Sequence, residues 1–155
     1  MVSELQGQNG PINSIAFSAD GRFIVTAGKD STSRIWDVNT RHLNVELRGH
    51  VSEVNSAAFS PDGNFIVTTG SDKRAIVWEA QTGRKIAELR GCDCRLYKAT
   101  FSPDGKFVLT TSEDGLARIY PWEMFAPFED IVAISYKNVV RQLTPEERDR
   151  YLHER

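Results

Sequence analysis

The chain has 155 residues and a formal net charge of −2, and 40% of its residues are hydrophobic and 26% charged. This balance is ordinary for a globular domain and gives no general attraction to nucleic acid or to acidic membrane surfaces. No apolar run approaches the ~18 residues of a membrane span, and the first residues lack the basic and apolar stretches of a secretory signal. We therefore expect a cytoplasmic protein that binds neither nucleic acid nor membranes.

Three consecutive copies of one segment follow each other at a step of 42 residues, from Gly7 to Gly49 to Gly91. The same step connects Phe17, Phe59 and Phe101; Asp20, Asp62 and Asp104; Gly21, Gly63 and Gly105; Asp30, Asp72 and Asp114; and Trp36, Trp78 and Tyr120. No gap is needed to align the copies. This regularity predicts three copies of one structural unit, at about residues 7–48, 49–90 and 91–120.

Each copy is predicted to contain short strands, shown best by the middle one. Residues 54–59 are rich in β-formers, and the turn sequence Ser-Pro-Asp-Gly at 60–63 separates them from a second strand at 65–69. Further strands are predicted at 74–78 and 85–89, and no segment of the copies has helical periodicity. Four strands in about 42 residues indicate one blade of a β-propeller.

Two dipeptides, one near the start of a copy and one near the end, resemble the motifs of a known repeat family. Gly49-His50 near the start of the middle copy and Trp36-Asp37 near the end of the first resemble the WD-repeat family, although the later copies end in Trp78-Glu79 and Tyr120-Pro121. The resemblance covers roughly residues 2–120. It implies an all-β fold, a half-propeller of three four-stranded antiparallel blades. It says little about function, because propellers host many unrelated activities.

The resemblance also implies a polar network inside each blade, made by a His, a Ser or Thr, an Asp and a Trp. In the middle copy these positions hold His50, Thr68, Asp72 and Trp78. A buried aspartate needs donors, which an imidazole and nearby turn amides supply, and the indole N–H gives the Trp a polar contact. The corresponding positions are Gln8, Thr26, Asp30 and Trp36 in the first copy, and Cys92, Thr110, Asp114 and Tyr120 in the third. Gln8 can still donate to Asp30, whereas a cysteine is a weak donor, so we expect the third blade to be the least rigid.

A catalytic reading of the same residues would make Thr68 a nucleophile beside a His–Asp pair. The Thr and the Asp, however, recur in all three copies, as a structural feature should. The phosphate-binding, metalloprotease and nucleophile-elbow motifs are absent from the sequence. We therefore predict no enzymatic activity, no catalytic residues and no cofactor, and the less favoured alternative is a hydrolase or ligand-processing propeller that uses the central channel.

Two cysteines, Cys92 and Cys94, flank Asp93. They are too few to suggest a disulfide scaffold. A zinc site needs about four ligands, and no second Cys or His pair lies nearby in the sequence. The preferred interpretation is a loop that varies where the repeat tolerates change, without a metal.

Several loop positions are predicted to line one end of the propeller, where WD-repeat proteins commonly bind their partners. Their side chains differ between the copies, which suits a binding surface and suits neutral drift equally well. The candidates precede each structural aspartate or follow each early glycine, and they are Lys29, Ser71, Glu113, Glu53 and Arg95. The partner would be a protein, which the sequence does not identify.

After Tyr120 the pattern changes to an aromatic linker and a short helical tail at 121–155. Apolar residues from Phe128 to Leu143 recur at three- and four-residue steps, which predicts an amphipathic helix, and Thr144-Pro145 with Glu147 predicts a second, short one. This ending resembles the C-terminus of bacterial, cyanobacterial-type proteins in which a NACHT-type NTPase module precedes a WD-repeat array. That resemblance implies an alternative role as the sensor or docking end of a larger signalling protein.

Propellers close with about four to eight blades, and three cannot form a ring. Residues Val2, Ser3, Glu4 and Leu5 lie 42 positions before the fourth strand of the first copy, whereas no fourth strand follows Tyr120. The chain thus has one predicted strand without a blade of its own, residues 2–5, and one blade without its fourth strand, the third. Unpaired edges and exposed apolar faces favour association, so we predict a homodimer in which each chain lends this strand to the other's third blade. The alternative is a fragment of a longer array.

Overall fold

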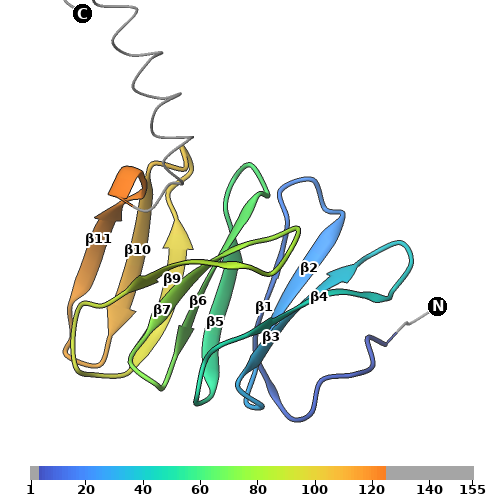
Figure 1. Cartoon of the computed structure of the whole chain (residues 1–155), viewed down its shortest axis with the longest axis horizontal. Coiled ribbons are helices and arrows are strands. Elements are labelled where there is room, and N and C mark those ends of the chain that lie inside the picture. The colour runs from blue at the N-terminus through green and yellow to red at the C-terminus, as the bar shows by residue number, and fades with distance from the viewer. Residues whose placement is uncertain (1–3, 125–155) are drawn as a thin grey trace, which may run out of the picture. The chain divides into compact units, whose positions relative to one another are not determined.

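The computed structural model describes residues 4–124, which form three antiparallel sheets side by side (Figure 1). The first sheet contains β1 (Ile12–Phe17), β2 (Phe23–Gly28), β3 (Thr32–Asp37) and β4 (Leu43–Arg48), in that order. The second contains β5 (Val54–Phe59), β6 (Phe65–Gly70), β7 (Ala75–Glu79) and β8 (Lys85–Leu89). The predicted all-β blades are confirmed. Each sheet is one blade, and the first, second and third blades follow the order of the chain.

The third blade has three strands, β9 (Leu96–Phe101), β10 (Phe107–Ser112) and β11 (Ala117–Pro121), and a short 3-10 helix η1 (Trp122–Met124) follows them. Within the described residues, β11 therefore has no neighbour on its outer side. The two predicted tail helices lie outside the described residues, as do Val2 and Ser3 of the predicted closing strand. Glu4 and Leu5 are not part of a strand in the single chain.

The same turn joins the first two strands of every blade. The hydroxyls of Ser18, Ser60 and Ser102 donate to Asp20, Asp62 and Asp104, with oxygen–oxygen distances of 2.5 to 2.6 Å. The glycine that follows each aspartate has φ between 70° and 75°, a left-handed conformation that glycine adopts without the penalty of a Cβ. The Ser-x-Asp-Gly sequence thus fixes the hairpin and the register of the strands beyond it.

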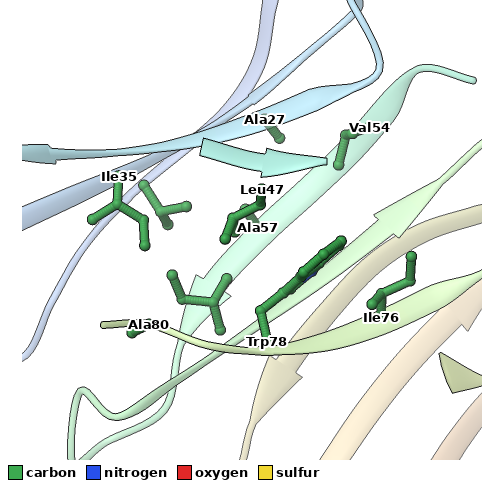
Figure 2. Packing of buried hydrophobic residues seen from close by; sticks show 10 residues of the cluster. Ala27, Ile35, Leu47, Val54, Ala57, Ile76, Trp78 and Ala80 are labelled. Atoms are coloured by element: carbon green, nitrogen blue, oxygen red, sulfur yellow. The ribbon is translucent and has the colours of Figure 1, made fainter. Parts of the chain in front are cut away.

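Two hydrophobic clusters lie between neighbouring blades. One packs Val25 and Ile35 of the first blade against Ala57 and Ile66 of the second, with Trp78 in the same layer (Figure 2). The other packs the opposite face of the second blade against Ala99, Phe101 and Val108 of the third. The second blade is therefore covered on both faces.

The innermost strands also share a polar contact between blades. The Asn13 side-chain amide donates to the Val54 carbonyl oxygen at 2.9 Å, and Asn55 donates to the Leu96 carbonyl oxygen at 2.7 Å. Tyr97 occupies the same place in the third blade, where it is half exposed. Within the described residues no helix has the length and apolar character needed to cross a bilayer.

Candidate functional site

The structure brings the four network residues of the second blade together. His50 Nδ1 lies 2.9 and 3.0 Å from the two carboxylate oxygens of Asp72, and its Nε2 lies 2.8 Å from Thr68 Oγ1. The Trp78 indole N–H donates to the same hydroxyl at 2.8 Å. Because the Asp72 carboxylate can only accept, His50 Nδ1 donates to it, and Nε2 of the neutral imidazole then accepts from the Thr68 hydroxyl.

Burial keeps this network free of net imidazolium charge. Thr68 is fully buried, and the His50 and Asp72 side chains are each 1% exposed. Removal of the ring from water lowers the pKa of His50 below its ordinary value of 6.5, and the neighbouring Asp72 carboxylate offsets only part of that effect. His50 is therefore neutral at pH 7, as the hydrogen-bond directions require.

In the first blade, the two polar atoms of the Gln8 amide take the roles of the two ring nitrogens of His50. Its amide nitrogen donates to Asp30 Oδ1 at 3.1 Å, and its amide oxygen accepts from Thr26 Oγ1 at 2.9 Å. Trp36 donates to Thr26 at 3.0 Å, as Trp78 does to Thr68. Gln8 thus contacts Asp30 from the position that histidine occupies in the second blade. A primary amide presents a donor and an acceptor much as the neutral imidazole does.

The third blade is built differently. Thr110 is buried, and its hydroxyl has no hydrogen-bond partner among residues 4–124, because the residue at the histidine position is Cys92, which is bonded to Cys94. Asp114 is bound instead by Arg118, at 2.6 and 3.2 Å, and by the Ser112 hydroxyl at 2.6 Å. Thr110 and Asp114 are not joined into the expected network.

Sequence reasoning missed the arginine that accompanies this change. Arg118 lies 84 positions after Arg34, which binds Asp30 at 2.7 Å in the first blade, and the intervening position holds Ile76. The guanidinium is thus present where histidine is absent. These arginines hold the pKa values of Asp30 and Asp114 well below the ordinary 3.8; for Asp30, burial opposes this lowering.

The third blade also has a serine at a position where the other two blades have a glycine. A Cβ built on Gly70 would lie 2.7 Å from His50 Nδ1 and 2.6 Å from Asp72 Oδ1, closer than real Cβ atoms approach their neighbours. Gly28 makes room for Gln8 in the same way, and Ser112 occupies this position in the third blade. The Ser112 side chain leaves room for a cysteine at position 92, but it would clash with a histidine ring at that position.

The five predicted partner-facing residues lie in loops at one end of the blades. The Ser71 amide donates to the Glu53 carbonyl oxygen at 2.9 Å, and the Glu113 amide donates to the Arg95 carbonyl oxygen at 2.9 Å. The Lys29 amide makes the corresponding bond to Pro11 at 3.0 Å. These paired loops hold the candidates side by side, and their role in partner binding stays a prediction.

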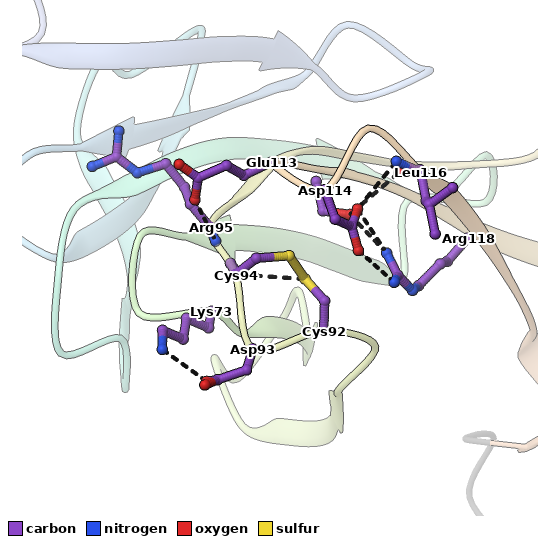
Figure 3. The surroundings of a disulfide bond; sticks show 10 residues. Lys73, Cys92, Asp93, Cys94, Arg95, Glu113, Asp114, Leu116 and Arg118 are labelled. Atoms are coloured by element: carbon purple, nitrogen blue, oxygen red, sulfur yellow. Dashed lines mark hydrogen bonds and ion pairs between the residues drawn. A yellow bond between two sulfur atoms is a disulfide. The ribbon is translucent and has the colours of Figure 1, made fainter.

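Cys92, Cys94 and Asp114 place three possible metal ligands within 4.8 Å of one another. The two sulfur atoms form a disulfide, and Arg118 already binds the carboxylate (Figure 3). The arrangement as it stands therefore leaves no ligand set for a cation. The sequence predicted a variable loop here and did not predict the bond.

The family model for the WD domain, G-beta repeat, matches residues 1–37, 41–79 and 83–121, more than half of the chain. The chain belongs to the WD-repeat family. A solved structure, "Structure of U3-55K", superimposes with a TM-score of 0.75 at 22% identity, over 78% of this chain and 39% of that one. This likeness shows the fold alone.

One curated relative is the target of rapamycin complex subunit LST8 from Bos taurus, which is 38% identical over 45 residues. The match covers 29% of this chain and 14% of that protein. That protein is, as its name states, a subunit of a complex. This WD-repeat chain thus spans less than half of each of these two proteins.

Proposed function

We propose that this WD-repeat chain is a non-enzymatic protein-binding scaffold whose three blades are completed into a six-bladed ring by a second copy. The observation that carries the proposal is a pair of exposed apolar faces, one on the first blade and one on the third. Each corresponds to a face that is buried between blades elsewhere in the same chain. Propeller blades are stable when such faces are covered by neighbours.

The leading face lies on the first blade and consists of Ile12, Ile15 and Phe17. Ile15 is 60% exposed, whereas its counterparts in the next blades, Ala57 and Ala99, are 3% and 1% exposed. Those counterparts pack against the preceding blade. The first blade therefore presents the surface that receives a preceding blade.

The trailing face lies on the third blade and consists of Phe107, Leu109, Ala117 and Ile119. Ile119 is 64% exposed, whereas Val77, its counterpart in the second blade, is fully buried against the third. The trailing and leading faces are thus the two halves of one junction that the chain already forms twice. In a dimer with two-fold symmetry, each trailing face meets the partner's leading face.

The open edge of β11 fits residues 2–5 of a second copy by charge as well as by spacing. In the first blade Arg34 lies opposite Glu46 in the β3–β4 pairing and binds it at 2.7 Å. Glu4 lies 42 positions before Glu46, and Arg118 lies 84 positions after Arg34. The same register would place Glu4 opposite Arg118, and Leu5 opposite Ala117.

Burial argues against the catalytic alternative. A nucleophile must be reached by its substrate, and Thr68 is fully buried beneath His50 and Trp78. Its hydroxyl is committed to both neighbours. The exposed loops at one end, which include Arg95 and Glu113, offer a charged surface suited to a protein partner.

Sedimentation velocity of the purified chain and its variants tests ring formation. Ile15→Glu and Ile119→Glu should each weaken dimerisation at least about tenfold, because each loses roughly 1.5–3 kcal/mol of apolar burial and introduces a charge at two symmetric junctions. Val51→Glu is the control, since Val51 is 75% exposed and belongs to neither face. Dimerisation of equal strength in all four proteins would reject these two faces as the junctions, and dimerisation by none of them would reject the homodimer.

A second candidate is supported by the chain's short coverage of its relatives. The same two faces would be covered by further blades if this segment belonged to a longer WD-repeat array, such as one linked to an NTPase module. In that case the isolated chain would aggregate rather than form a defined dimer. The sedimentation experiment separates these outcomes.

A further inference from the structure

The disulfide between Cys92 and Cys94 lies within one loop, the connection from β8 to β9 (Figure 3). Both cysteines are half-buried, and Asp93 between them is exposed. The bond connects residues two positions apart and joins no strand to another. Because the stabilisation from loop closure grows with loop length, this bond contributes near the minimum that a disulfide can.

The loop is attached to both neighbouring turns at the end of the blades. The Lys73 ammonium, in the β6–β7 turn, binds the Asp93 carboxylate at 2.7 Å. Arg95 accepts a hydrogen bond from the Glu113 amide through its carbonyl oxygen, and its own amide donates to the Glu113 carboxylate at 3.4 Å. The conformation of residues 92–95 therefore affects the positions of three charged side chains, Lys73, Asp93 and Glu113, of which Glu113 is one of the predicted partner-facing residues.

The surroundings also suit thiol chemistry. A thiolate is the reactive form of cysteine, and nearby cations favour it whereas a free carboxylate opposes it. The Asp114 carboxylate lies within 4.8 Å of both sulfur atoms, but its charge is neutralised by Arg118. Both cysteines are thus partly accessible, and the carboxylate that lies within 4.8 Å of their sulfur atoms is paired with a guanidinium.

We propose that Cys92 and Cys94 form a reversible thiol–disulfide exchange site, with small-molecule disulfides such as oxidised glutathione as its oxidants. One thiolate attacks the small disulfide and releases one thiol. The second cysteine then attacks the mixed disulfide and releases the other. Two electrons and two protons pass to the small molecule, and the Cys92–Cys94 bond forms. The redox state then sets the geometry of the loop that holds Asp93 and Arg95.

The first test uses the full chain, dithiothreitol, and reduced and oxidised glutathione, with thiol trapping followed by mass spectrometry. We expect the bond to be reduced while far-UV circular dichroism and tryptophan fluorescence stay native, and to re-form completely with oxidised glutathione. Cys94→Ser should instead stop at a mixed disulfide on Cys92. A bond that resists reduction until the protein unfolds would overturn the proposal.

The second test measures amide hydrogen exchange in the oxidised and reduced chain. Reduction should make the Arg95 and Glu113 amides exchange roughly fivefold faster, since each would lose about one net hydrogen bond. The Ser71 amide, which makes the same bond to Glu53 in a loop without cysteines, is the internal control. The variant Cys92→Ser/Cys94→Ser should exchange at the fast rate under both conditions. Unchanged exchange at Glu113 on reduction would contradict the coupling between redox state and loop geometry.

Discussion

The second and third blades carry the same aspartate at the head of the same turn and satisfy it in different ways. Asp72 is buried beneath a neutral imidazole in a blade that is covered on both faces. Asp114 is partly exposed and pairs with Arg118 in a blade that is covered on one face only. The aspartate is present in both blades, and the residues around it differ as a set. Gly70 accompanies His50 in the second blade, whereas Ser112 accompanies Cys92 and Arg118 in the third.

The repeat thus preserves a hydrogen-bonded aspartate rather than a fixed set of partner residues. In the second blade the Asp72 carboxylate is 1% exposed, and a neutral imidazole beside it adds no second charge that would have to leave water. Arginine binds the aspartate in the first blade, where the Asp30 side chain is 10% exposed, and in the third, where the Asp114 side chain is 29% exposed. The change of partners in the third blade leaves the buried Thr110 hydroxyl without a hydrogen-bond partner among residues 4–124, which is unfavourable.

Exchanging the glycine and serine between the blades should give the largest effect. Gly70→Ser would drive the side chain into His50 and Asp72, and we expect a loss of about 3 kcal/mol from overpacking and broken hydrogen bonds. Urea unfolding followed by tryptophan fluorescence measures it. Ser112→Gly is the matched control and should cost less, because only one hydroxyl is removed. Equal losses would mean that the two sites are not organised differently.

Removing the threonine hydroxyls should have a smaller effect that differs between the blades. Thr68→Val leaves the Trp78 indole and His50 Nε2 without their partner, which should cost ~2 kcal/mol. Thr110→Val removes a buried hydroxyl that has no partner in the described residues, so stability should stay the same or rise. Thermal and urea unfolding of the two variants provide the measurement. A loss at Thr110 as large as that at Thr68 would show that Thr110 is hydrogen-bonded after all.

Lowering the pH should destabilise the second blade through His50. Because the folded state lowers the pKa of His50, its contribution is complete above about 6.5 and is lost as the pH falls below that value. Between pH 7 and 5 the unfolding midpoint in urea should therefore fall. His50→Gln, which copies Gln8 of the first blade, should flatten this dependence, and an unchanged slope would rule out His50 as its source.

Raising the salt concentration should give the smallest effect, at the aspartate of the third blade and not at that of the second. The Leu116 amide donates to Asp114, whose ion pair with Arg118 is partly exposed and open to screening. The Val51 amide donates to the buried Asp72. Amide exchange should accelerate modestly at Leu116 and stay constant at Val51. The reverse order would contradict the assignment of the exposed ion pair to the third blade.

The sequence predicted much of this arrangement because its repeat has no gaps. The strands 54–59 and 85–89 are observed as β5 and β8 with the predicted bounds, and the His50–Thr68–Asp72–Trp78 network is assembled. The arginines were missed, although the step of 42 that revealed Asp30 and Asp114 would also have revealed Arg34 and Arg118. Comparison of positions that differ between copies, and not only of those that agree, would have found them.

Other features could not follow from the sequence pattern. Cysteines two positions apart are compatible with free thiols, a ligand pair or a disulfide, and only their geometry decides among these. The loss of the Thr110 partner depends on where the Cys92 side chain points. The exposure of Ile15 and Ile119 depends on which blades are present, a property of the assembly and not of either strand.

Native mass spectrometry of an equal mixture of unlabelled and 15N-labelled chains tests the two-chain ring most directly. Each chain has a mass of 17.4 kDa. We predict a particle of two chains in which, after exchange, the mixed species is twice as abundant as either pure one. Detection of single chains alone, at micromolar concentration and with native circular dichroism, would contradict the completion of the third blade by a second copy.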